Sequence, residues 1–106
     1  MKSKNKPERY AIIANKNYGL YAGIVDSVEQ LSDGLMRVEA SEVRHVARWF
    51  GKTGGITSLA VHGLCGPRAS ESRIGAPAPR ATLAGVVNIF DCTQEARATI
   101  EAATQS

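Results

Sequence analysis

The stretch from Arg44 to Gly55, RHVARWFGKTGG, gathers residue types that bind anions. It contains Arg44, Arg48, Lys52 and Trp49, the single tryptophan of the chain. Guanidinium and ammonium groups attract phosphate, and an aromatic face can stack on a nucleobase. These residue types therefore predict a site for an anionic, nucleotide-like ligand.

Gly51-Lys52-Thr53 resembles the end of a phosphate-binding loop. That signature requires a glycine five residues before Gly51, and Val46 stands there, so we reject a nucleotide hydrolase. The residues Thr53 to Gly55 still lead into an expected helix, whose free N–H groups can hold an anion beside Lys52. The alternative is an ordinary glycine turn between two elements.

Trp49 and the neighbouring arginines allow two interpretations. On a strand, Arg44 and Arg48 share one face and Trp49 points to the other. In the functional interpretation the ring and the cations bind a base and a phosphate. In the alternative, Trp49 belongs to the core and the arginines are solvated.

Residues 66–80 are rich in glycine, proline, serine and arginine and predict a long loop. In it, Arg68, Arg73 and Arg80 with Ser70 and Ser72 either close over an anion or form a flexible, solvated excursion. From both stretches we predict these ligand-binding residues: Arg44, Arg48, Trp49, Lys52, Gly54, Gly55 and Arg73.

Catalysis and metal binding have little support in the sequence. His62 and Cys65 are close enough along the chain for a Cys–His pair, but no third group is evident to orient the imidazole. Cys65 and Cys92 fit no metal spacing. We therefore expect no enzyme, no cofactor and no metal.

The charge of the chain is unevenly distributed. The net charge is +3, and residues 42–80 contain six basic side chains against two acidic ones. Such a basic centre favours an anionic partner. Residues 1–8 predict a disordered basic tail before a single domain over 9–106. No apolar run is long enough for a membrane span, and no signal-peptide pattern follows the first lysines.

Short apolar segments separated by turns predict the secondary structure. Strands are expected at 9–14, 20–26, 35–40 and 82–90, and turns at 17–19 and 32–34. Residues 41–50 fit a helix or a strand, and we favour the strand. Helices are expected at 57–63, with Thr57 as its cap, and at 94–103, capped by Asp91 or Thr93. The predicted fold class is α+β: a small antiparallel sheet, one short helix, a long loop and a C-terminal helix packed on the sheet.

Three stretches, NYGLYAGIVDS, RHVARWFGKTGGITSLAVHG and IFDCTQEARATI, resemble a family of small proteins of tailed bacteriophages and prophages. The resemblance covers residues 9–103. The function of that family is unassigned, so the resemblance implies a context: a phage protein acting in the cytoplasm of the bacterial host.

The leading hypothesis is a non-enzymatic phage protein that sequesters a nucleotide-derived immune signal as a homo-oligomer, in the manner of an anti-defence sponge. An accessory protein that binds nucleic acid through the same basic residues ranks second. A structural or host-interaction module is the third hypothesis.

Overall fold

The computed structural model describes residues 8–16, 19–52 and 55–105. Its elements, in chain order, are β1 (Tyr10–Asn15), β2 (Gly19–Gln30), β3 (Met36–Arg48), α1 (Ile56–His62), the 3-10 turn η1 (Ala69–Glu71), β4 (Arg73–Ile74), β5 (Ala78–Asp91) and α2 (Gln94–Ala102).

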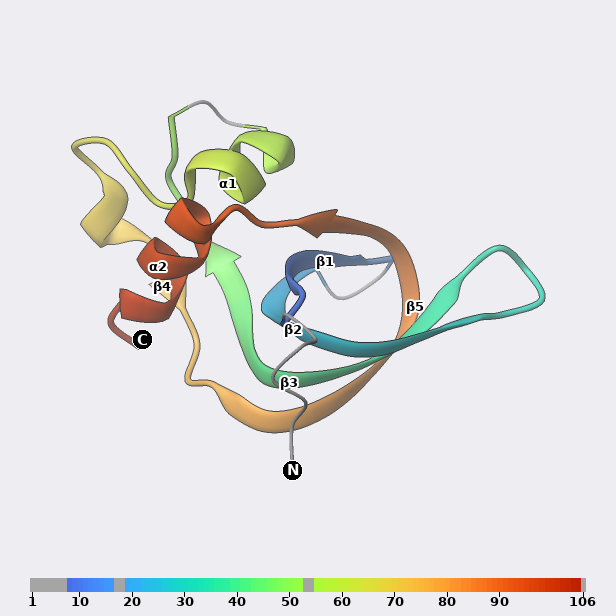
Figure 1. Cartoon of the computed structure of the whole chain (residues 1–106). Coiled ribbons are helices and arrows are strands. Elements are labelled where there is room, and N and C mark those ends of the chain that lie inside the picture. Colours follow the sequence, from blue (N-terminus) through green and yellow to red (C-terminus); the bar gives the residue numbers. More distant parts are fainter. Residues whose placement is uncertain (1–7, 17–18, 53–54, 106) are drawn as a thin grey trace.

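The antiparallel sheet closes on itself. β1 pairs with β2, β2 with β3, β3 with β5, and β5 returns to pair with β1. The short strand β4 extends the sheet along the end of β3. β2, β3 and β5 are long and contain shifts of register, which let each strand bend and change partners. Figure 1 shows these curved strands, with the β2–β3 hairpin projecting away from the helices.

Two hydrophobic clusters lie on opposite faces of this sheet. One is inside the curved sheet and consists of strand residues alone, including Ile13, Val38 and Val86. The other joins the outer face of β1 and β2 to α1, β4 and α2, and Leu59 and Ile100 are its fully buried helical members. β1 is therefore buried on both faces, which explains its continuous apolar run.

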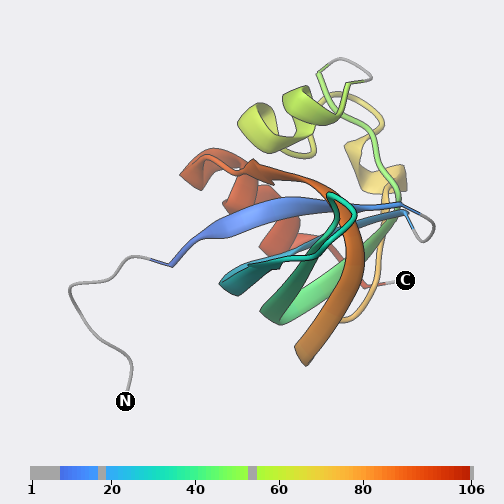
Figure 2. The same ribbon diagram turned by 90° about the vertical axis from the view of Figure 1, so that its right-hand side faces the viewer.

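The two helices lie on the same side of the sheet (Figure 2). α1 ends at Gly63, whose φ of 72° suits glycine and whose N–H donates to the Leu59 carbonyl. α2 begins after Thr93, whose Oγ1 accepts a hydrogen bond of 3.0 Å from the Ala96 N–H. The same hydroxyl donates to the Val61 carbonyl, so one side chain connects the ends of both helices.

Much of the predicted secondary structure is confirmed. The α+β class with an antiparallel sheet is correct, although strands dominate over helices. Residues 41–48 continue β3 as a strand, and Leu20, Ala22 and Ile24 share the face of β2 that the alternation predicted. The 17–19 turn falls partly outside the described residues. No helix in the described part of the chain is long and apolar enough to cross a membrane.

The prediction of a long loop at 66–80 is wrong in part. This segment contains η1, the strand β4 and the start of β5, because the buried side chain of Ile74 anchors it to the outer hydrophobic cluster. The cap of α1 is also different from the prediction. Gly55, and not Thr57, is the N-cap, and it has no side chain to accept a capping hydrogen bond.

Candidate anion-binding surface

The end of β3 and the strand β4 bring two of the predicted arginines together. Arg48 and Arg73 are direct partners in this antiparallel pair. Opposed side chains in such a pair leave the sheet on the same face, with their Cβ atoms about 5 Å apart. Both arginines are exposed to solvent. Two positively charged side chains therefore begin at neighbouring positions on this edge of the sheet.

Two guanidinium groups lie over the ring of Phe50. The Cζ atom of Arg48 lies 5.3 Å from the ring centroid, and that of Arg68, from the segment before η1, lies 4.2 Å from it. The backbone N–H of Phe50 donates to Ser72 Oγ over 3.1 Å, which fixes the end of β3 against the segment that follows η1. We call Arg48, Arg68 and Arg73 the arginine cluster.

One carboxylate accompanies these three cations. Arg68 donates from Nε and Nη2 to the two oxygens of Glu71, over 3.1 and 2.8 Å. That hydrogen bonding, with the charge of Arg48 as a smaller cause, lowers the pKa of Glu71. Within the described part of the chain, neither Arg48 nor Arg73 forms an ion pair. The surface therefore has an excess of positive charge.

Trp49 lies on the other side of the strand from the arginine cluster. It is half-buried and packs against the outer hydrophobic cluster. Strict alternation would place Trp49 on the opposite face from Val46, but both residues pack in the outer hydrophobic cluster. The register shift between Val46 and Arg48 accounts for this, because a bulge changes which face the following side chains occupy. The aromatic ring of the arginine cluster is therefore Phe50, a residue that the sequence analysis did not select.

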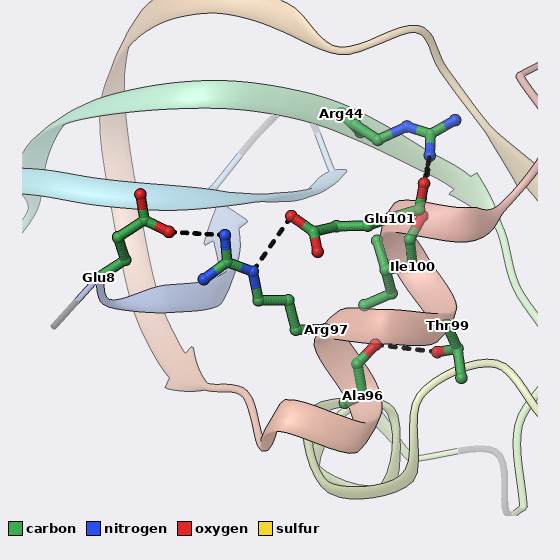
Figure 3. A network of polar contacts seen from close by, with 7 residues as sticks. All are labelled: Glu8, Arg44, Ala96, Arg97, Thr99, Ile100 and Glu101. Atoms are coloured by element: carbon green, nitrogen blue, oxygen red, sulfur yellow. Dashed lines mark hydrogen bonds and ion pairs between the residues drawn. The ribbon is translucent and has the colours of Figure 1, made fainter.

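Arg44 is not part of the anion-binding surface, because its side chain is buried. Its side chain is only 4% exposed. Nε donates to the Gly75 carbonyl over 2.6 Å and Nη1 to the Ile100 carbonyl over 2.8 Å, with longer contacts to the carbonyls of Glu101 and Ile74. Figure 3 shows its bond to Ile100 in the last turn of α2. Arg44 thus holds the C-terminal end of α2 against β3.

A polar network of α2 lies beside Arg44. Arg97 forms ion pairs with Glu8 and Glu101, at 2.7 and 3.1 Å (Figure 3). Its guanidinium also lies over the ring of Tyr10. Glu8 was assigned to the disordered tail, and its ion pair ties it to α2; residues 1–7 lie outside the described residues. Burial, followed by the charge of Glu101, raises the pKa of Tyr10, so its hydroxyl stays neutral.

Lys52 and Gly55 lie at the start of α1, away from β4. Lys52 lines an open hollow of about 320 Å³ together with Thr57, Ser58, Val61 and His62. Gly55 is the exposed N-cap of the helix, and Gly54 lies outside the described residues. Of the predicted ligand-binding residues, the β3–β4 pairing brings together Arg48 and Arg73.

The remaining candidates fall elsewhere. Arg80 belongs to β5, where its partner is Ser41, so it is not part of the arginine cluster. Both cysteines are free and half-buried, and burial raises the pKa of Cys92 to about 11. Among residues 8–16, 19–52 and 55–105, no three His, Cys, Asp or Glu side chains are grouped to hold a metal.

Together these features define a small α+β domain with a closed sheet and an exposed arginine cluster at the β3–β4 edge. The chain belongs to the family described as a domain of unknown function (DUF6948), and the match covers residues 8–100. No curated protein and no solved structure matches the chain.

Proposed function

We propose that this chain is a non-enzymatic binding protein for a phosphate-bearing anion, which the arginine cluster holds. The observation that carries the proposal is the pairing of Arg48 with Arg73 across β3 and β4. Neither arginine has an ion-pair partner among the described residues.

Electrostatics favours an anion at this place. Like charges directly opposite each other on a sheet destabilise the pairing of the strands. An anion bound between the two arginines is attracted by both and offsets their mutual repulsion. Guanidinium groups suit phosphate because their N–H groups form paired, charge-assisted hydrogen bonds with its oxygens. The arginine cluster and Phe50 supply groups that bind a ligand, and none of the four is a nucleophile or a general base.

The finer proposal concerns the ligand and its context. Following the resemblance to small proteins of tailed phages, we propose that the ligand is a nucleotide-derived immune signal, which a homo-oligomer sequesters in the cytoplasm of the bacterial host. The excess of basic residues between 42 and 80 supports an anionic ligand.

Isothermal titration calorimetry tests the proposal. The ligands are pyrophosphate, cyclic dinucleotides, cyclic trinucleotides and ADP-ribose derivatives. The variants Arg48→Gln and Arg73→Gln each remove one charge from the site, and Arg80→Gln removes one charge from the exposed surface of β5 as a matched control.

We expect at least one ligand to bind, and each site variant to weaken it roughly 10-fold or more, the usual worth of a charge-assisted hydrogen bond. Arg80→Gln should bind like the wild type. No heat with any ligand, or an equal loss in all three variants, would contradict the proposal. Tight binding of duplex DNA together with indifference to these ligands would favour the nucleic-acid hypothesis instead.

A further inference from the structure

The guanidinium of Arg68 lies over the ring of Phe50, and its side chain is exposed to solvent. Its Cζ lies 4.2 Å from the ring centroid, and 55% of the Arg68 side chain is exposed. We propose that the stacked pair of Arg68 and Phe50 is a platform for a nucleobase, so that the anion bound by the arginine cluster is the phosphate of a nucleotide. This inference rests on the proposed function, because Arg48 and Arg73 would hold the phosphate end of the same ligand.

Glu71 restricts the orientation of the Arg68 guanidinium. Both carboxylate oxygens accept from Arg68, one from Nε and one from Nη2. Two parallel bonds of this kind define the plane of a guanidinium, whereas a single bond leaves it free to rotate. Because the guanidinium also lies over the Phe50 ring, it is held at two places and its exposed part is available to a ligand. Unstacked bases bind to both aromatic rings and guanidinium planes.

The ion pair between Arg68 and Glu71 also distinguishes Arg68 from the other two arginines. Glu71 balances the charge of Arg68, which leaves Arg68 suited to stacking more than to holding phosphate. Arg48 and Arg73 keep their charges uncompensated by any ion pair within the described residues. The guanidinium groups of Arg48 and Arg68 both lie over the Phe50 ring. The proposed base platform and one of the two proposed phosphate-binding arginines are therefore neighbours. This arrangement suits a nucleotide, in which a base and a phosphate belong to one molecule.

A comparison of ligands with equal phosphate groups tests the platform. The full chain is titrated by calorimetry with pyrophosphate and with the diphosphates of adenosine, guanosine, cytidine and uridine. Stacking of a base contributes about 5- to 150-fold in affinity. We expect at least one nucleoside diphosphate to bind more tightly than pyrophosphate by a factor in this range.

Two variants then locate the preference. Phe50→Leu removes the ring but keeps an apolar side chain, and should reduce the ratio of nucleotide to pyrophosphate affinity toward 1 with pyrophosphate binding retained. Glu71→Gln releases the Arg68 plane and adds one net positive charge. It should strengthen pyrophosphate binding while the nucleotide preference falls. If circular dichroism shows that Phe50→Leu is unfolded, Glu71→Gln decides the question.

The outcomes separate the two proposals. If pyrophosphate and all four nucleoside diphosphates bind the wild type equally well, the platform is wrong, and the proposal that the arginine cluster binds a phosphate-bearing anion stands. A nucleotide preference that survives in Glu71→Gln and in folded Phe50→Leu also overturns the platform. If none of the five ligands binds, and none of the cyclic nucleotides or ADP-ribose derivatives does, both proposals fail.

Discussion

Replacement of Arg44 by methionine tests whether this buried arginine serves the fold. Methionine keeps an unbranched apolar side chain and removes the guanidinium. The two short bonds, to the carbonyls of Gly75 and Ile100, are each worth about 1.5–3 kcal/mol as hydrogen bonds to a charged group. The two contacts of 3.4 Å, to Ile74 and Glu101, add little.

The net effect is smaller than the sum of the lost bonds. Removing the charge also removes the cost of burying it, which offsets part of the loss. We therefore expect Arg44→Met to lower the free energy of unfolding by about 2–4 kcal/mol. For a domain of this size, the corresponding fall in melting temperature is roughly 10–20 °C.

Urea or thermal unfolding followed by circular dichroism measures this change. Arg80→Met, an exposed arginine on β5, is the matched control and should stay within about 0.5 kcal/mol of the wild type. Arg44→Lys keeps the charge but loses the fork that reaches several carbonyls, so it should destabilise the protein as well. An Arg44→Met protein as stable as the wild type would refute the reasoning. So would one that keeps its stability but loses ligand binding, because Arg44 would then belong to the binding site.

Three further predictions concern Gly63 after α1, Thr93 at the start of α2, and the thiol of Cys92 between β5 and α2. Gly63→Ala should destabilise the protein severely, because a Cβ there collides with the Thr99 hydroxyl. Gly34→Ala, also at positive φ but with open space around it, should cost only about 1 kcal/mol in a denaturation experiment. Thr93→Ala should cost roughly 1–2 kcal/mol through loss of the α2 cap, with a loss within about 0.2 kcal/mol arguing against the capping bond. Burial raises the pKa of Cys92 from 9.0 to about 11. Between these pH values the native thiol keeps a proton that the unfolded chain has lost, so stability should fall as the pH rises from 9 to 11. A Cys92→Ala variant should show a shallower fall, and an identical pH profile would contradict the assignment.

The sequence predicted the strands well because their side chains alternate with a clear period. Leu20, Ala22 and Ile24 fall on one face of β2, as the pattern required. The position of Trp49 does not follow from this period, because β3 shifts its register between Val46 and Arg48, and both Val46 and Trp49 pack in the outer cluster. The alternation therefore did not identify Phe50 as the ring beside Arg48.

The role of Arg44 had no local signal either. Arg44 and Arg48 are the same residue type on one strand. Their difference arises from the register shift between Val46 and Arg48 and from distant segments that cover only Arg44. These segments are the last turn of α2 and the backbone of Ile74 and Gly75. Closure of the sheet was equally hidden, because it depends on the pairing of β5 with both β1 and β3.

The strand β4 shows a further limit of local patterns. It has two residues, and its apolar signal is the single side chain of Ile74 amid glycine, proline and serine. Pairing with β3 makes it a strand, and that pairing is also what places Arg73 opposite Arg48. The central pair of the proposed site therefore follows from tertiary structure.

The most direct test of the arginine cluster is the melting temperature of Arg73→Gln with and without pyrophosphate. If Arg48 and Arg73 are held together for an anion, removing one charge relieves their repulsion. The variant without ligand should then be as stable as the wild type or more stable, by up to about 1 kcal/mol. Pyrophosphate should raise the melting temperature of the wild type clearly more than that of Arg73→Gln. An equal rise in both proteins, or no rise in the wild type with any of the proposed ligands, would contradict the account.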